Sequence, residues 1–360
     1  MSLRPVPHQV LEVELADVRP FARLLRGIGF KHNAVMSVSE AGFEVTLEEV
    51  RTLCVTRLMS LAVAWIPVNL FKTFIFHPSP VPAIVEISLD TMLQCLNIFG
   101  NAGSGGAAAP SRQRSSRRWA GDGEQEEEEQ DNGPRKGKEK RTQMRMTWEG
   151  IGSELMIHLQ DEGKGPVTTC ALKTLEPEEL MNQEFDDDQR VLYIIMKSGW
   201  FRQALADLPP SCKKVTFTAT PRDSDVPPPV MDATGSSNDR RTQRARKGNF
   251  SILAEGDLGK TELDYPNDRE VMDRFECPER ISFSYHAAHI MLLYRALQHS
   301  IKICIQIETE GFLCVQIMMP VGEDVPVGGH SGILEFKKVT ENDSRGIASN
   351  VQMHALEEGM

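Results

Sequence analysis

The stretch from Ala254 to Thr261, AEGDLGKT, comes close to the pattern of a phosphate-binding loop, with alanine in place of the first glycine. Such a loop needs a helix directly after it, because backbone N–H groups at the helix N-terminus bind the phosphate. Here Pro266 follows after five residues, and the flanking segments alternate like strands. We therefore predict a hairpin turn between two strands and no nucleotide site.

Three histidines in the last helix-like segment are candidates for metal chemistry. His286 and His289 are one helical turn apart, and His299 lies further along. A zinc site needs three or four ligands in a supporting shell, and no cysteine or carboxylate stands at a matching offset. We interpret these residues as ordinary surface or core histidines, and we predict no metal ion and no cofactor.

The segment VRPFARLLRGIGF, residues 18–30, carries a basic pattern. One face of the predicted helix is apolar and consists of Phe21, Leu24, Leu25 and Ile28. Arg19, Arg23 and Arg26 follow at i, i+4 and i+7 on the opposite face, and no acidic residue faces them within the helix. The pattern predicts a bare arginine stripe.

The overall charge makes this stripe unusual. The 360 residues include 40 lysines and arginines against 51 aspartates and glutamates, a formal net charge of −11. Two low-complexity segments, 101–147 and 221–247, carry more basic than acidic residues and cannot bury a core. The remaining chain has 24 basic against 39 acidic residues, so a basic stripe there needs a local explanation.

The cysteines and the apolar segments bound the compartment. Seven cysteines are dispersed without a CxxC pair, which predicts free thiols in a reducing environment. The first residues show no signal-peptide pattern, and the most apolar stretch, 58–68, is too short to span a bilayer. We expect a soluble intracellular protein.

The periodicity then predicts the elements that position the arginines. Helix-like stretches at 18–30, 89–100, 198–209 and 286–300 recur among alternating, strand-like runs. The order of strand, helix, strands, helix and strands occurs twice, and an acidic segment, 172–190, separates the two parts. This predicts an α+β protein with two similar halves.

Several segments, in their order and spacing, resemble the Rad-one/Rec-one family, one subunit of the heterotrimeric checkpoint sliding clamp (the nine-one-one ring). They are LLRGIGFKHNA, LDTMLQCLNIFG, TLEPEE, SGWFRQALADL, LDYPNDREVMDRFEC and IKICIQIETEGFL. The resemblance covers nearly all of the chain outside the two charged segments. It implies a DNA sliding-clamp (processivity-factor-like) fold with two similar domains, each with an antiparallel sheet and two helices.

The resemblance also implies how the chain meets DNA. Three subunits would close a ring by pairing edge strands, with the helices around the central hole and the sheets outside. The basic side chains would then meet DNA phosphates without sequence preference. The expected DNA-binding residues are Arg19, Arg23, Arg26, Lys31, Arg202, Arg295 and Lys302. The alternative is an ordinary solvated helix face.

The domain boundaries follow from these patterns. A first clamp domain is expected over 1–171 with a charged insert at 101–147, and a second over 191–340 with an insert at 221–247. Residues 172–190 resemble the interdomain connector of sliding clamps, which lies near a hydrophobic pocket for partner peptides; a plain linker is the alternative. Residues 341–360 are expected to be a tail.

The resemblance implies a nuclear clamp subunit without catalytic residues. Its expected partners are two other clamp-like subunits, an ATP-using clamp loader, double-stranded DNA, and checkpoint and repair proteins, with no membrane. The alternatives are a 3′-to-5′ DNA exonuclease and a scaffold that never encircles DNA. A two-metal nuclease needs three or four convergent carboxylates. The candidates are Glu12, Glu14, Asp186, Asp187, Asp188, Asp264 and Asp268, and nothing in the sequence brings them together.

Some segments depart from the family pattern or suggest regulation. Residues 55–63, VTRLMSLAV, have no recognisable counterpart. Either they are an insertion that does not belong to the mature protein, or they bulge from a strand connection in the first domain. The basic clusters RQRSSRR, PRKGKEKR and RRTQRARK are typical of nuclear import signals or of solvated loops. Thr142 and Thr242 each precede glutamine, a pair that resembles checkpoint-kinase targets.

Overall fold

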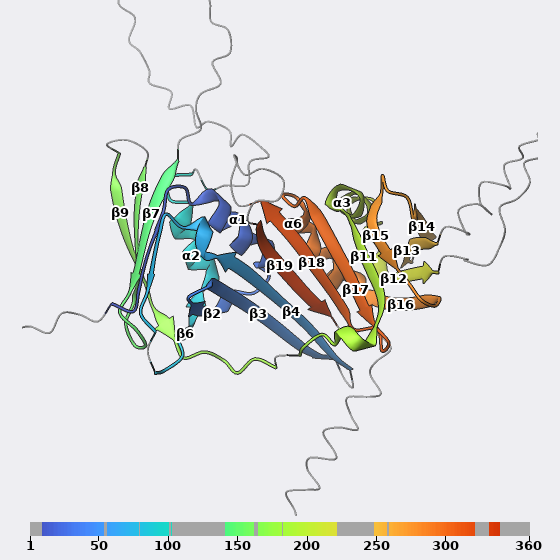
Figure 1. The fold of residues 1–360 in the computed structure, drawn as a ribbon, viewed down its shortest axis with the longest axis horizontal. Helices are drawn as coiled ribbons and strands as arrows, with labels where there is room; N and C mark the ends of the chain where they lie inside the picture. The colour runs from blue at the N-terminus through green and yellow to red at the C-terminus, as the bar shows by residue number, and fades with distance from the viewer. Residues whose placement is uncertain are drawn as a thin grey trace, which may run out of the picture.

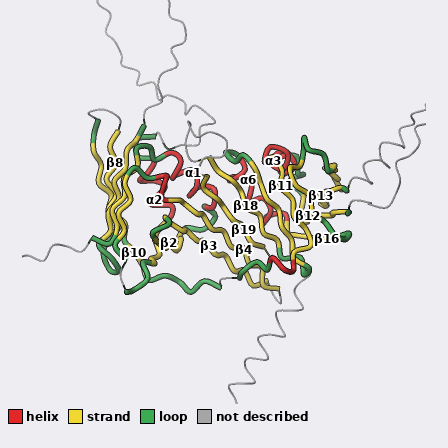
Figure 2. Tube along the Cα trace, in the orientation of Figure 1, coloured by secondary structure: helices red, strands yellow, loops and turns green. Residues whose placement is uncertain are grey.

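The computed structural model describes residues 9–53, 56–78, 80–100, 102, 141–161, 165–181, 183–221, 248–257, 259–320 and 331–338. Over these residues the chain is an α+β protein, in which long antiparallel strands accompany a few short helices (Figures 1 and 2). No helix in these residues is long and apolar enough to cross a membrane.

The element order repeats once along the chain, as the sequence pattern predicts. The first half contains β1 (Leu11–Leu15), α1 (Arg19–Ile28), β2 (Asn33–Ser39), β3 (Gly42–Leu53), β4 (Thr56–Pro67), β5 (Thr73–Phe76), β6 (Ile84–Ser88), α2 (Leu89–Leu96), β7 (Thr142–Trp148), β8 (Leu155–Asp161) and β9 (Val167–Leu172). The second half contains β11 (Arg190–Lys197), α3 (Ser198–Ala206), β12 (Cys212–Thr220), β13 (Asn249–Gly256), β14 (Gly259–Pro266), β15 (Met272–Glu276), β16 (Ile281–His286), α5 (Ala287–Met291), α6 (Leu293–Leu297), β17 (Lys302–Glu308), β18 (Leu313–Pro320) and β19 (Ser331–Lys338). The short β10 (Thr174–Leu175) and the 3-10 turns η1 (Val68–Leu70) and η2 (Asp187–Gln189) complete the order.

The described strands form three sheets. One has the order β5-β1-β7-β8-β9 and another the order β14-β13-β12-β16. The largest, β10-β6-β2-β3-β4-β19-β18-β17-β11-β15, takes strands from both halves. The halves join where β4 pairs with β19, with Trp65 opposite Ile333 and Ser60 opposite Lys338.

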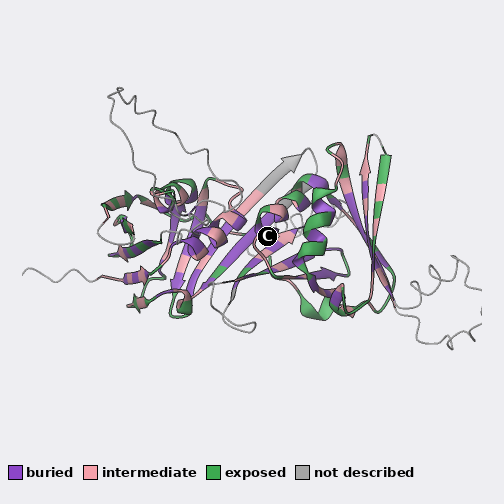
Figure 3. Cartoon of the chain, turned by 90° about the horizontal axis from the view of Figure 1, so that it is seen from above, coloured by how far each residue is buried: buried purple, intermediate pink, exposed green. Residues whose placement is uncertain are grey.

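The helices form a row on one face of the ten-stranded sheet. Helix α1 contacts α2 on one side and α6 on the other, and α6 in turn contacts α3. Figure 3 shows both buried and exposed residues along these helices, as expected for elements with one face on a sheet. In each half a helix phenylalanine packs edge-on against a strand phenylalanine: the ring centroids are 6.3 Å apart for Phe21 and Phe43, and 6.1 Å for Phe201 and Phe217.

Several expectations about local structure can now be compared with the fold. The segment around Ala254 is a hairpin, as predicted, with Gly256 opposite Gly259. The six cysteines among the described residues are free, and Cys54 lies outside them. The expected bulge at 55–63 is wrong, because residues 56–63 form β4, which pairs with both β3 and β19. Val55 lies outside the described residues.

The expected boundary of the first insert is also wrong at its C-terminal end. Residues 142–147 belong to β7, where apolar side chains alternate into the core, so this segment is not loop-like. Thr142 is 1% exposed in this strand, which removes it as an accessible kinase target. The basic clusters, Thr242 and the tail lie outside the described residues.

Candidate nucleic-acid interface

Helix α1 positions three of the expected DNA-binding residues. Pro20 in its first turn has a backbone angle suited to a helix start, and the helix ends where the Gly29 N–H donates to the Arg26 carbonyl over 3.2 Å. The apolar face is buried as predicted, and Arg23 and Arg26 are half-buried on the other side. Burial and the nearby Arg23 guanidinium lower the pKa of Arg26.

The expectation that Arg19 belongs to a bare stripe is wrong. Its side chain is nearly buried, and Nη2 lies 2.7 Å from Asp17 Oδ2. Asp17 Oδ1 also accepts the Arg19 backbone N–H over 3.0 Å. No acidic residue lies within the helix, but Asp17 precedes its first residue by two positions.

Two arginines reach the same region from the second half. The exposed Arg202 on α3 donates from Nη1 to the Gln298 carbonyl over 3.4 Å, at the end of α6. Arg295 on α6 donates from Nη1 to the Gly29 carbonyl, the last turn of α1, over 2.9 Å. The contact between α1 and α6 thus gathers basic residues that are more than 170 positions apart in the sequence.

His299 marks the place where these charges converge. Burial lowers its pKa, and the guanidinium groups of Arg23, Arg26 and Arg202 lower it further. From the sequence, His299 was interpreted as an ordinary surface or core histidine. Its one local signal was its position just after α6, which did not reveal the arginines of α1.

Two of the expected DNA-binding residues are engaged elsewhere. Lys31 forms an ion pair with Glu178 of the connector, with Nζ and Oε2 3.1 Å apart. Lys302 is the first residue of β17, and Ile303, Ile305 and Ile307 fill the helix-side core. Because side chains alternate along a strand, Lys302 lies on the opposite face, where Nζ is 2.7 Å from Asp273 Oδ2. The expectation that Lys302 lies on the helix side is therefore wrong.

The carboxylates that a nuclease would need are divided among β1, η2, β14 and the turn before β15. Glu12 on β1 accepts a hydrogen bond from the Arg145 guanidinium, and Glu14 accepts one from Thr73 Oγ1 over 3.4 Å. Asp264 on β14 accepts from Asn249, and Asp268 lies in the turn before β15. Asp186, Asp187 and Asp188 lie at the end of the connector, around η2. In the described part of the chain, no group of three or more His, Cys, Asp and Glu side chains is arranged to hold a metal ion.

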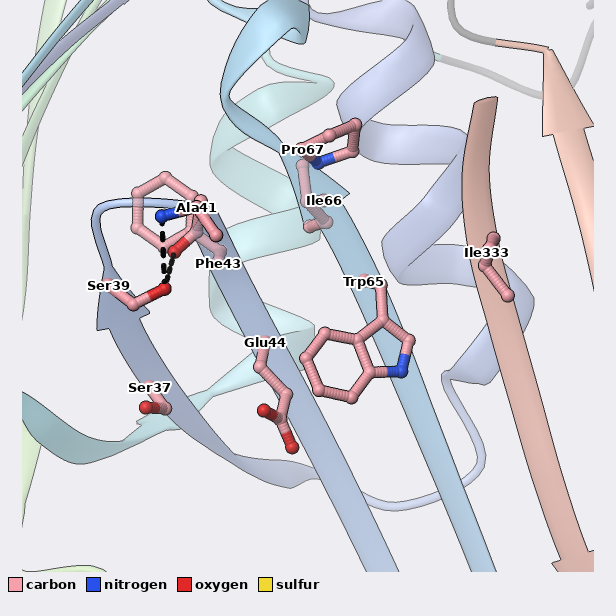
Figure 4. Close-up of a pocket in the computed structure, with 10 residues that line it drawn as sticks. Ser37, Ser39, Ala41, Phe43, Glu44, Trp65, Ile66, Pro67 and Ile333 are labelled. Carbon is pink, nitrogen blue, oxygen red and sulfur yellow. Dashed lines mark hydrogen bonds between the residues drawn. The ribbon is translucent and has the colours of Figure 1, made fainter. Parts of the chain in front are cut away.

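The other face of the ten-stranded sheet carries an apolar row at the junction of the halves. Met318, Ile333 and Trp65 are opposite one another across β18, β19 and β4, and each is at least 40% exposed. Trp65 lies beside a cavity of about 290 Å³, whose walls include Phe43 and Pro67. Figure 4 shows the side chains that line it. None of the connector residues that the structure describes lines this cavity.

Comparison with known proteins gives a consistent family. A family model described as repair protein Rad1/Rec1/Rad17 matches residues 10–319. The chain is 25% identical over 309 residues to the human cell cycle checkpoint protein RAD1 and 26% identical over 309 residues to that of mouse, covering 86% of this chain and 86% of each relative. It is 24% identical over 284 residues to a Mycosarcoma maydis protein named DNA repair exonuclease REC1, covering 68% of this chain and 59% of that relative.

Proposed function

The chain belongs to the Rad1/Rec1/Rad17 family of repair proteins, and we propose that it is one subunit of a heterotrimeric checkpoint clamp. The ring encircles double-stranded DNA at sites of damage in the nucleus, after an ATP-using loader has placed it there. It then recruits checkpoint and repair proteins. The chain contributes shape, charge and docking surface to this role, and no catalytic residue.

The pairing of β4 with β19 is the observation that carries the proposal. It joins two halves with the same element order edge to edge, into one sheet with one row of helices. By their position in the repeat, β14 corresponds to β4 and β9 corresponds to β19. Both β9 and β14 end their sheets among the described strands, so each is free to pair with a neighbouring clamp-like subunit. Repeating this contact between three two-part subunits closes a ring.

The charge distribution fits DNA inside that ring. The helix row continues across both halves, and Arg23, Arg26, Arg202 and Arg295 lie on it, whereas the body of the chain is acidic. Arginine binds phosphate oxygens through several N–H groups, and contacts confined to phosphates carry no sequence information. Such a lining lets the ring slide along the duplex.

The apolar row on the opposite face supports the recruiting role. Met318, Ile333 and Trp65 are exposed large side chains on a rigid sheet, beside a cavity of about 290 Å³. Contiguous exposed apolar surface is typical of protein interaction sites. We propose that a short apolar segment of a partner protein docks there, on the outside of the ring.

The decisive experiment is the native mass of the tagged protein purified from its own cells, measured by light scattering. A one-to-one-to-one complex with two different clamp-like chains supports the proposal, and its retention on nicked circular DNA should end when the circle is linearised. A homotrimer would instead indicate a replication-type clamp. A persistent monomer would contradict a clamp of either kind.

The name of the Mycosarcoma maydis relative is the one observation for a second candidate, a 3′-to-5′ exonuclease. That activity would be lost on chelation and abolished by Asp→Asn changes, and it would survive repurification. The separation of the carboxylates described above favours the clamp.

A further inference from the structure

Two cysteines from distant parts of the first half meet at the edge of its five-stranded sheet. Cys95 lies in the last turn of α2, and Cys170 lies on β9, 75 positions further along the chain. Helix α2 packs against β9, the outermost strand of that sheet (left in Figure 1). The two thiols are within hydrogen-bonding range of each other, and both are free in this structure.

The local structure of each element turns its cysteine toward the other. Exposed and half-buried side chains alternate along β9 up to the buried Leu172, so Cys170 shares the helix-facing side of the strand with Leu172. On α2, Met92 and Leu96 are buried, and Cys95 lies at the margin of that face. Both cysteine side chains pack against the core and are still partly exposed. A small oxidant in solution can therefore reach the pair.

A second pair of cysteines shows why closeness on a sheet is not sufficient for a disulfide. Cys304 on β17 is opposite Gln316, and Cys314 on β18 is opposite Gln306, so the two cysteines are diagonal neighbours. The Cα atoms of diagonal neighbours are about 7–8 Å apart, whereas a disulfide joins residues whose Cα atoms are about 4.4–6.8 Å apart. The hydrogen bonds between the two strands fix that diagonal separation.

The contact between α2 and β9 is not fixed in this way. It joins a helix to an edge strand through side chains, and among the described strands β9 is paired only with β8. An edge strand that is hydrogen-bonded on one side moves at lower cost than a strand in the middle of a sheet. The two sulfur atoms can therefore approach from contact to bonding distance without breaking the sheet.

The two thiols differ in reactivity. Burial and the neighbouring Cys170 thiol raise the pKa of Cys95 to about 11. Cys95 therefore stays protonated near neutral pH, and a protonated thiol is a poor nucleophile toward a peroxide. This difference assigns the first attack to Cys170 and leaves Cys95 as the resolving thiol.

We propose that Cys95 and Cys170 form a redox-modification site, in which hydrogen peroxide converts the two thiols into a disulfide that ties β9 to α2. First, the Cys170 sulfur attacks one peroxide oxygen and the O–O bond breaks, which gives a sulfenic acid at Cys170 and one water molecule. The Cys95 sulfur then attacks the sulfenic sulfur, and the hydroxyl group leaves as water with the Cys95 proton. The two electrons lost by the thiols reduce the peroxide, and a thiol reductant reverses the reaction.

The bridge stabilises the edge of the first half. It closes a long loop of the chain and so lowers the entropy of the unfolded state. It also anchors β9, the strand that we propose to pair with a neighbouring subunit. The chemistry of the site needs no ring, so it stands or falls independently of the proposed clamp function.

The test is a disulfide map of the full-length wild-type chain after exposure to hydrogen peroxide. Remaining thiols are alkylated, the protein is digested without reductant, and the peptides are identified by mass spectrometry. We expect one linked peptide pair that contains Cys95 and Cys170, with monomer mobility on a non-reducing gel and loss of the link on addition of dithiothreitol. Free or separately oxidised cysteines at these positions, or linkage of either one to a different cysteine, would overturn the site.

Three variants test the assigned roles. In Cys95→Ser the sulfenic acid at Cys170 has no resolving thiol, so dimedone, which reacts with sulfenic acids, should label Cys170. In Cys170→Ser, Cys95 should stay unlabelled over the same time. Cys304→Ser is the matched control and should form the bridge as wild type does. Equal labelling in the first two variants would overturn the order of attack.

Thermal unfolding measures the consequence for the fold. The oxidised wild type should unfold about 5 °C above the reduced wild type, whereas peroxide should not raise the Tm of Cys95→Ser. Under reducing conditions the variants should unfold close to wild type, which checks that the fold is retained. A bridge that forms without raising the Tm would overturn its role in holding β9.

Discussion

Gly27 on α1 faces Ala296 on α6 where the two halves meet: a Cβ built on Gly27 would lie 3.5 Å from the Ala296 Cβ and would overlap Leu334 Cδ1. Two helices from different halves approach this closely because both residues are small. The approach brings the arginines of α1 within reach of His299 and lets Arg295 reach the Gly29 carbonyl. One small residue therefore helps to set both the junction of the halves and the charge cluster.

Enlarging Gly27 should weaken this junction. We expect Gly27→Val to lower the free energy of unfolding by about 1–3 kcal/mol, because Leu334 and Ala296 leave no room for the added methyl groups. The measurement is urea unfolding followed by circular dichroism. Gly199→Ala on α3 is the matched control: nothing lies within 4 Å of its added Cβ, so stability should stay the same or rise slightly. Equal effects at the two glycines would contradict the close contact.

Arg19 should matter for stability and not for DNA. Replacing it by methionine leaves Asp17 without its ion-pair partner, and we expect a loss of about 1–3 kcal/mol of unfolding free energy with unchanged DNA affinity. Arg202→Met, at an exposed position, should show the reverse pattern. Chemical unfolding and duplex titration of both variants provide the comparison. A strong loss of DNA binding in Arg19→Met would instead support the prediction that Arg19 contacts DNA together with Arg23 and Arg26.

The free edge of β9 should be needed for assembly. Val167 is 63% exposed and Ala171 is also exposed, so the double change Val167→Asp and Ala171→Asp should leave the subunit folded. Charged side chains on an edge strand disfavour pairing with another chain. We therefore expect loss of one partner subunit in co-purification. Ile75→Asp is the control: it lies on β5, an edge strand that takes no part in the proposed contact between subunits, so this variant should assemble normally. A complex that still forms with the β9 changes would contradict the proposed contact.

Lys338 should make stability depend on pH. It is 1% exposed, and its Nζ donates to Ser60 Oγ over 3.2 Å at the junction of β19 and β4. Burial lowers the pKa of Lys338 to about 7, partly offset by Glu49. The unfolded chain, with an ordinary lysine pKa, binds this proton more tightly, so stability falls as the pH drops from about 10 to 7 and levels off below that.

Lys338→Met removes this dependence. Between pH 10 and pH 7.5 wild type should lose about 3 kcal/mol of unfolding free energy at this site, and the variant, which has no charge to bury, should not lose it. Urea unfolding at the two pH values measures the difference. Parallel pH profiles would show that Lys338 is solvated in the native protein.

The sequence by itself determined the elements whose signals are local. Apolar residues at helical spacing predicted α1. Alternating segments on both sides of the turn, with Pro266 shortly after it, predicted the hairpin at Gly256, and the repeated pattern predicted two similar halves. These signals act between residues a few positions apart, so they can be recognised without knowing the fold. Segment 55–63 was misjudged because it has no recognisable counterpart in the family pattern. Its place in the sheet depends on pairing between residues such as Ser60 and Lys338, 278 positions apart, which no local signal shows.

Only the tertiary structure decided which charges remain available. The sequence did not show which face of its strand Lys302 occupies, because a shift of one residue exchanges the two faces. In the structure Lys302 lies on the face opposite the helices. Lys31 is engaged by Glu178, 147 positions away, and His299 meets Arg23 and Arg26 only because α1 packs on α6. The electrostatic state of a side chain depends on the neighbours that folding brings to it, and those neighbours come from distant parts of the chain.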